Sequence, residues 1–369
     1  MPEPSPSLAS AARFWLRLGL VSFGGPAGQI ALLHSELVQR RRWLSERRFL
    51  HALNYCMLLP GPEATQLATY LGWLMHGQRG GLVAGGLFLL PSVVLLLGLS
   101  CLYALWGQQP LLVALFWALK PAVLAIVLQA AWRLGRRTLH HPLLLAIAVA
   151  AFLGLVWLQL PYPLLVVAAA LCGWIGGRLR PGWFQGTAAA APGPVKPSPV
   201  KPSPVKPGPG APAPDQSATE QSATVRPALH DDDTATPAHA VVSKRRLALS
   251  LLVSGLALAL PLAALSWRGG WDGLLATMAR FFTRVALISF GGAYAVLPYV
   301  AQGAVETHGW LSAHEMLDGL ALGETTPGPL IMVVAFVGFM GGWNSSGSLS
   351  QALLAGLVVV WFTFLPSFV

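Results

Sequence analysis

The chain is poor in charge. Only 10% of its 369 residues are Asp, Glu, Lys or Arg, whereas about 25% is usual for a soluble globular protein. Hydrophobic residues make up 54%, and the mean hydropathy is +0.60. So few charges cannot cover the surface of a soluble globule. The composition therefore predicts an integral membrane protein, with the lipid bilayer as its surroundings.

Cysteine is scarce as well. Cys56, Cys101 and Cys172 stand singly within apolar runs, without the spacing of a metal site or of a disulfide framework. No metalloprotease, nucleophile-elbow, Walker or dinucleotide-binding motif occurs. The N-terminus lacks the basic start of a cleavable signal peptide. We therefore predict no metal site, no cofactor and no enzymatic activity.

The few charges are mostly positive, with a formal net charge of +10. Basic residues gather in short loops beside apolar runs, and the loop over residues 40–48 holds five arginines. Lys and Arg in such loops favour the cytoplasmic side of a membrane. No basic stretch is interleaved with aromatic residues, as single-stranded nucleic acid requires. We therefore predict no nucleic-acid partner.

Part of the sequence occurs twice. Three short motifs of the first half return in the same order in the second half: Ser22-Phe23-Gly24-Gly25 as Ser289-Phe290-Gly291-Gly292, Trp43-Leu44-Ser45 as Trp310-Leu311-Ser312, and Pro60-Gly61-Pro62 as Pro327-Gly328-Pro329. Gly291 minus Gly24 gives 267, and so does Arg284 minus Arg17. Several matches at one ungapped offset indicate an internal duplication.

The two copies define the predicted domains. Residues 1–180 form the first repeat, and residues 247–369 form the second. Between them, residues 181–246 are rich in Pro and Lys, cannot bury a core, and are predicted to be a disordered cytoplasmic linker. The first repeat continues well beyond Pro91-Ser92, whereas the second stops soon after the matching Pro366-Ser367. We therefore expect the second repeat to be truncated at the C-terminus.

Charge bias predicts how the repeats face the membrane. The loop at 303–315, which corresponds to the arginine-rich loop at 40–48, contains no Lys or Arg. Opposite bias in equivalent loops indicates opposite orientation, the plan of many secondary transporters. The basic residues at 79, 133–137, 178 and 244–246 fall on one side if runs 10–38 and 49–76 are broken hairpins, whereas Arg268 then falls on the other. The predicted fold class is an all-α polytopic membrane protein with two inverted-topology repeats and broken or re-entrant helical hairpins.

The breaks themselves predict an anion site. Pro60 and Pro62, with Gly61 between them, cannot continue a helix, so the chain must stop and restart. A helix that restarts after Gly25 or Gly61 leaves free amide groups and a positive dipole end. Such an end binds anions. Two repeats supply four of these ends, and we expect them to converge.

Ionisable residues near the breaks are further candidates. Arg17, Arg284 and Lys120 lie in apolar runs, where a charge is costly unless it is paired or hydrated. The alternatives are that the arginines reach out to the membrane interface and that Lys120 pairs with a carboxylate. Glu63 and Glu324 can pair with these cations, carry a coupling proton, or cap a helix start.

Neutral polar residues complete the predicted site. Asn54, Thr65, Gln66, Thr325 and Thr326 can hydrogen-bond an oxyanion or equally satisfy broken backbone. The predicted substrate-binding set is Arg17, Ser22, Gly24, Gly25, Asn54, Pro60, Gly61, Glu63, Lys120, Arg284, Ser289, Gly291, Gly292, Glu324, Thr325, Thr326 and Gly328.

These motifs resemble the bacterial chromate ion transporter family. The resemblance rests on Ser-Phe-Gly-Gly-Pro-Ala-Gly-Gln-Ile at 22–30, Leu-Leu-Pro-Gly-Pro-Glu-Ala-Thr-Gln at 58–66, and Gly-Glu-Thr-Thr-Pro-Gly-Pro-Leu-Ile at 323–331. It covers both halves but not the linker. It implies an inner-membrane carrier that expels chromate from the cytoplasm and confers resistance, driven by the membrane potential or a proton gradient. Sulfate or another oxyanion as substrate, a passive anion channel, and assembly as a homo-oligomer stay open as alternatives.

Overall fold

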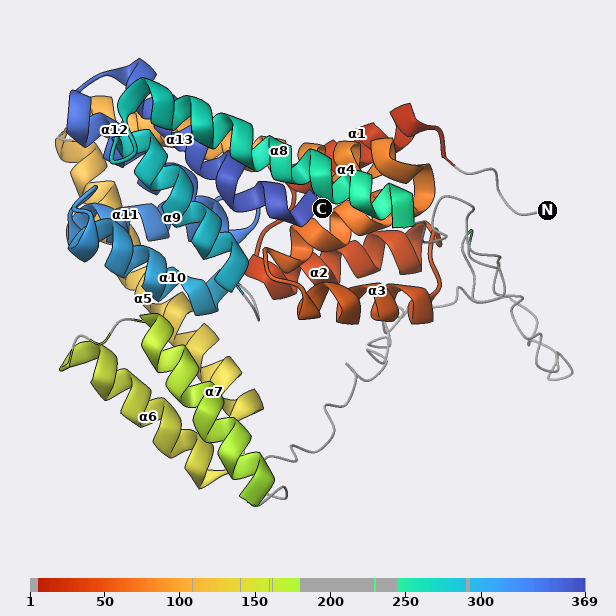
Figure 1. Ribbon diagram of the computed structural model, residues 1–369, viewed down its shortest axis with the longest axis horizontal. Helices are drawn as coiled ribbons and strands as arrows, with labels where there is room; N and C mark the ends of the chain where they lie inside the picture. Colours follow the sequence, from red (N-terminus) through yellow and green to blue (C-terminus); the bar gives the residue numbers. More distant parts are fainter. Residues whose placement is uncertain are drawn as a thin grey trace, which may run out of the picture. The chain divides into compact units, whose positions relative to one another are not determined.

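The computed structural model describes residues 6–107, 109–139, 141–158, 160, 162–179, 229, 244–289 and 293–368 (Figure 1). All regular structure in these residues is helical, which confirms the all-α class. The elements are α1 Leu8–Leu20, α2 Gly25–His34, η1 Ser35–Arg40, α3 Glu46–Leu58, α4 Glu63–Trp106, α5 Pro110–Thr138, α6 Pro142–Val156, α7 Tyr162–Leu179, α8 Lys244–Gly269, α9 Leu274–Ile288, α10 Ala293–Ala301, η4 Gln302–Thr307, α11 Ala313–Thr325, η5 Leu330–Met332, α12 Val333–Ser346, α13 Leu349–Phe364 and η6 Leu365–Phe368.

The chain forms two compact units. One combines Met1–Val127 with Pro227–Val369, and the other comprises Leu128–Arg226. The first unit therefore contains α1–α4 from the first repeat together with α8–α13. The second unit contains the end of α5 and the packed pair α6 and α7. The predicted linker at 181–246 lies almost wholly outside the described residues.

The helix bounds repeat with the sequence. The π-helices η1 at 35–40 and η4 at 302–307 are 267 positions apart at both ends, and so are α3 at 46–58 and α11 at 313–325. The duplication seen in the sequence is therefore also a duplication of local structure.

Helices α1 and α2 form a hairpin that breaks where the glycines predict. The guanidinium of Arg41, just beyond η1, lies 4.5 Å from the ring centroid of Phe14 in the middle of α1. The two helices therefore run antiparallel, with the tip of the hairpin between Leu20 and Gly25. Gly24 has φ +90° and Gly25 has φ +65°, values that glycine adopts at no steric cost.

Helices α3 and α4 make a second hairpin, and α4 itself turns back. The chain reverses at Pro60-Gly61-Pro62, so that Tyr55 and Tyr70 face each other at 6.2 Å. Within α4, His76 and Gly77 leave helical geometry, and the segments on either side pack together through Gly72 and Ala84. In the second repeat the same fold-back is made by separate helices α12 and α13.

Each repeat has its own core. Trp15, Phe49 and Phe88 are buried among α1–α4, and Phe282 and Phe336 among α9–α13. The second half of α4 joins the second core through Leu89, Leu96 and Leu97. Because lipid tails are as apolar as these side chains, close packing rather than burial from water stabilises such contacts in a membrane. The core shared by α4 and α12 holds the two repeats together.

The membrane-spanning character is visible in the outward-facing side chains. Among the described residues, three helices are long and apolar enough to cross a bilayer: Glu63–Trp106, Leu247–Gly269 and Leu349–Phe368. The first of these includes the turn at Gly77. In Leu247–Gly269 the most apolar stretch has no buried residue. The helix packs on α9 only through partly buried residues such as Leu258 and Leu262, and its apolar outer face suits contact with lipid.

Candidate functional site

The breaks of the two repeats meet. The amide of Gly61 donates a hydrogen bond to the carbonyl oxygen of Ser289 over 2.8 Å, and the amide of Gly328 donates to the carbonyl oxygen of Ser22 over 2.6 Å. Ser22 and Ser289 are repeat equivalents, as are Gly61 and Gly328. The two bonds are therefore the same contact made twice with the repeats exchanged. This crossing of four hairpin tips, hereafter the crossing, is pseudo-two-fold symmetric.

The Pro-Gly-Pro sequences explain why these amides are available. Gly61 has φ +127° and Gly328 has φ +121°, a region that favours glycine over every other residue. The flanking prolines carry no N–H group, so the glycine is the only backbone donor of its motif. In each repeat the motif therefore stops a helix and points its one remaining donor at the other repeat.

Two serines outside the predicted set complete the contact. A Cβ atom on Gly61 would lie 3.0 Å from Oγ of Ser367, and one on Gly328 would meet Oγ of Ser92. Ser92 Oγ also donates to the carbonyl oxygen of Pro327 over 2.7 Å. The Pro-Ser match at 91–92 and 366–367 was the sequence signal for these residues, because each serine packs on the glycine of the other repeat.

Several buried polar atoms around the crossing have no hydrogen-bond partner among the described residues. The side chains of Ser22 and Ser289 are 0% and 1% exposed, and most buried polar groups in proteins are satisfied. The unpartnered atoms near the crossing are Ser22 Oγ, Gln29 Oε1 and Nε2, Thr65 Oγ1, Gln66 Oε1, Thr69 Oγ1, Ser289 Oγ and Ser367 Oγ. Leaving such groups unsatisfied costs about 1–3 kcal/mol each, so they favour a polar ligand or water at this place.

Four helices start at the crossing, as the breaks predict. They begin at Gly25, Glu63, Ala293 and, through η5, Leu330. Neither α2 nor α4 has a side-chain cap at its N-terminus, so first-turn amides are free to bind. A Cβ atom on Gly25 would lie 3.1 Å from Oη of Tyr294, which brings the starts of α2 and α10 together. These positive helix ends favour an anion.

Two carboxylates adjoin these helix starts. Glu63, the first residue of α4, is 7% exposed and has no hydrogen bond or ion pair among the described residues. Glu324 is half-buried and accepts a hydrogen bond from the hydroxyl of Tyr294. A deprotonated carboxylate at either position repels an anion, whereas a protonated one does not.

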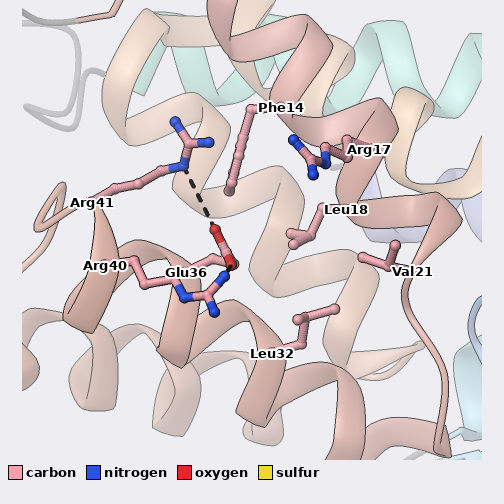
Figure 2. Close-up of a pocket in the computed structure, with 8 residues that line it drawn as sticks. All are labelled: Phe14, Arg17, Leu18, Val21, Leu32, Glu36, Arg40 and Arg41. Atoms are coloured by element: carbon pink, nitrogen blue, oxygen red, sulfur yellow. Dashed lines mark hydrogen bonds and ion pairs between the residues drawn. The ribbon is translucent and has the colours of Figure 1, made fainter.

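Four other predicted site residues are exposed, unlike the buried residues of the crossing. Arg17 is exposed and lines an outer cavity of about 470 Å³ (Figure 2), and Arg284 lines a second of about 410 Å³. Asn54 is exposed on α3. Thr325 is also exposed, and its hydroxyl donates back to the carbonyl of Ala321 over 2.8 Å.

Of the remaining predicted site residues, only Thr326 has a side chain in the described part of the chain. Thr326 is buried one residue before the second Pro-Gly-Pro. Lys120 lies in α5, but its side chain is outside the described part of the chain. Gly291 and Gly292 also lie outside it. No group of His, Cys, Asp or Glu residues in the described part could hold a metal ion.

Comparison with known proteins gives one consistent family. The family model described as Chromate transporter matches residues 9–174 and 276–369. The chain is 30% identical over 348 residues to a chromate transport protein of Pseudomonas aeruginosa, covering 93% of this chain and 68% of the relative. It is 27% identical over 339 residues to a probable chromate transport protein of Synechococcus elongatus, covering 92% and 70%. No solved structure matches.

Proposed function

The chain belongs to the chromate transporter family, and from this we propose that it is a secondary active transporter that exports chromate across the bacterial inner membrane and confers chromate resistance. Family membership makes it a membrane transport protein and not an enzyme. The substrate, the direction of transport and the membrane are parts of the proposal.

The crossing is the observation that carries the proposal. Chromate is a tetrahedral dianion, so its site needs hydrogen-bond donors from several directions. The crossing offers the uncapped first-turn amides of α2 and α4 and the hydroxyls of Ser22 and Ser289, which have no partner among the described residues. Fixed donors in a site shielded from water bind charge strongly because little competing solvation is present.

The way the tips are joined suits a carrier that opens alternately to the two sides. In the observed crossing, two backbone hydrogen bonds join the tips of one repeat to those of the other. Each contributes about 0.5–1.5 kcal/mol net, so separating the tips costs little compared with unfolding a hairpin. We propose that the repeats are inverted and that each hairpin pair opens the crossing to one side in turn.

Glu63 is suited to couple transport to protons. It is buried at the start of α4 without a partner among the described residues. A deprotonated Glu63 repels chromate, whereas a protonated one leaves the helix end free for the anion. In the proposed cycle the proton of Glu63 leaves together with the chromate dianion. A net negative charge then moves outward, so a membrane potential that is negative inside drives export. The arginine-rich loop at 40–48 faces the cytoplasm in this arrangement.

Flux measurements test the function. Everted vesicles expose the cytoplasmic face, so energised vesicles that contain the protein should accumulate chromate, and vesicles without it should not. Uptake that only equilibrates and survives dissipation of all ion gradients would show a passive channel. Sulfate uptake that chromate does not inhibit would show a sulfate carrier instead.

A further inference from the structure

Two outer cavities remain unexplained by the crossing. Pocket A lies between α1 and the α2–η1 segment (Figure 2). It measures about 470 Å³ and is lined by Phe14, Arg17, Leu18, Val21, Leu32, Glu36, Arg40 and Arg41. Pocket B measures about 410 Å³ and is lined by Asp272, Thr277, Arg280, Phe281, Arg284 and His308. Both are rich in cations, which a lipid-facing surface does not require.

The two pockets are one structure built twice. Phe14 and Phe281 are repeat equivalents, and so are Arg17 and Arg284. In pocket A the ring of Phe14 packs edge-on against Trp43 at 4.8 Å. In pocket B the ring of Phe281 packs in the same way against the equivalent Trp310 at 5.4 Å.

A cation or an imidazole covers the aromatic pair in both pockets. Arg41 lies over Phe14 at 4.5 Å and over Trp43 at 5.2 Å. Its repeat equivalent, His308, stacks on Trp310 at 4.5 Å. Both repeats therefore keep the Phe–Trp pair, whereas the side chain that packs on this pair is arginine in pocket A and histidine in pocket B.

One arginine in each pocket has no hydrogen-bond or ion-pair partner among the residues that the structure describes. Arg40 and Arg41 pair with Glu36 at 2.7 and 3.7 Å. Arg280 donates to the carbonyl oxygen of Trp271 over 2.7 Å. Arg17 and Arg284, in contrast, have no hydrogen bond or ion pair among the described residues. Figure 2 shows Arg17 on α1, across the pocket from Glu36 and Arg40.

The pockets differ in charge. Pocket A holds Arg17, Arg40 and Arg41 against Glu36, a net charge of +2. Pocket B holds two arginines against Asp272, whose side chain is 99% exposed and well hydrated. Burial, followed by the charges of Arg280 and Arg284, lowers the pKa of His308, so the imidazole is neutral near pH 7. Pocket B then has a net charge of +1 and attracts an anion less strongly than pocket A.

We propose that pockets A and B are outer binding sites for a divalent tetrahedral oxyanion, A for capture before the crossing and B for release after it. This inference rests on the proposed function. Pocket A ends at Val21, the residue before Ser22 of the crossing, so a captured anion is next to the central site. A basic pocket raises the local anion concentration and the rate of association. The weaker pocket B lets the anion leave.

A lipid phosphate offers the same chemistry as a free oxyanion, so the test separates the two. Initial rates of chromate uptake are measured in proteoliposomes of phosphatidylcholine alone and with phosphatidylglycerol, with transporters facing as in everted vesicles. Arg17→Gln should raise KM by about fivefold to tenfold in both lipid mixtures and leave kcat unchanged, because it removes one charged hydrogen-bond partner. Arg17→Lys should recover part of this loss.

Matched variants sharpen the comparison. Arg13→Gln removes the same charge one turn earlier on α1, outside pocket A, and should leave KM unchanged. Arg284→Gln should raise KM only for uptake from the opposite face. An unchanged KM in Arg17→Gln overturns the proposal, and an effect confined to vesicles with phosphatidylglycerol assigns pocket A to lipid.

Equilibrium dialysis with radiolabelled sulfate separates this inference from the proposed function. Weaker sulfate binding by Arg17→Gln than by Arg13→Gln supports the pocket even if the wild-type protein carries no chromate. Equal binding by the two variants, in a wild-type protein that does carry chromate, overturns the pocket and leaves the function standing.

Discussion

The amide of Gly61 bonds to the carbonyl oxygen of Ser289 across 228 residues of sequence, since 289 minus 61 is 228, and Gly328 repeats this contact with Ser22. Neither bond is possible unless the hairpin tips of both repeats reach the same place. The two hydrogen bonds therefore fix the position of the hairpin tips of one repeat against those of the other. These bonds also make the backbone of the Pro-Gly-Pro motifs a structural part of the crossing.

Alanine at either glycine should damage the crossing. A left-handed conformation costs an L-residue about 1–2 kcal/mol, and both glycines have positive φ. The added Cβ would also press on Gln66 and Ser367 at Gly61, and on Ser92 at Gly328. We expect Gly61→Ala and Gly328→Ala to lower both the thermal unfolding midpoint of the detergent-solubilised protein and chromate uptake.

Gly86→Ala is the matched control for this prediction. Gly86 lies in the helical part of α4, and a Cβ there meets no atom within 4 Å. Because alanine favours the helix over glycine by about 1 kcal/mol, this variant should be at least as stable as the wild-type protein. Unchanged unfolding and uptake in both crossing variants would contradict the role given to the motif.

Alanine at the crossing serines should separate function from stability. The hydroxyls of Ser22 and Ser289 are buried without partners in the described part of the chain, so their removal costs the folded state no hydrogen bond. A bound oxyanion, however, loses a donor. We expect Ser22→Ala and Ser289→Ala to raise the KM for chromate about tenfold, with an unfolding midpoint equal to or above that of the wild-type protein.

Ser92→Ala should show the opposite pattern. Its hydroxyl already donates to the carbonyl oxygen of Pro327 over 2.7 Å, so its loss should cost about 1 kcal/mol of stability. The same thermal and uptake measurements serve for all three variants. Lower stability without a change in KM for Ser22→Ala would mean that the hydroxyl supports the fold and not the anion.

Much of this arrangement could be predicted from the sequence because its causes are local. Proline and glycine side by side break a helix, so the breaks near Gly24 and Gly61 follow from local residue types, whereas a single proline such as Pro91 lies inside a helix. The offset of 267 then predicts the bounds of the second copy. Packing between hairpins is not local, and for this reason Ser92 and Ser367 were missed although their Pro-Ser match was visible.

Depth in the structure was equally hard to predict. The offset of 267 shows that Arg17 and Arg284 occupy equivalent positions in the two repeats. Equivalent positions occur in the outer pockets as well as at the crossing, so the offset does not show where the two arginines lie. Both arginines lie in the outer pockets, where exposure replaces pairing as the way to accommodate a charge. The prediction that they bind substrate therefore becomes a prediction about those pockets.

The orientation of the repeats is decided by the direction of the pseudo-two-fold axis. The reciprocal bonds at the crossing fit an axis in the membrane plane, which inverts the repeats, and equally an axis along the membrane normal, which does not.

Arg47 and His314 are exposed repeat equivalents just after the starts of α3 and α11, so cysteine at each reports the side of its loop. The native cysteines, Cys56, Cys101 and Cys172, are replaced first. We expect a membrane-impermeant thiol reagent outside intact cells to label His314→Cys, and to label Arg47→Cys only in everted vesicles. Labelling of both variants from one face would establish parallel repeats, and alternating access would then need a mechanism other than exchange between inverted halves.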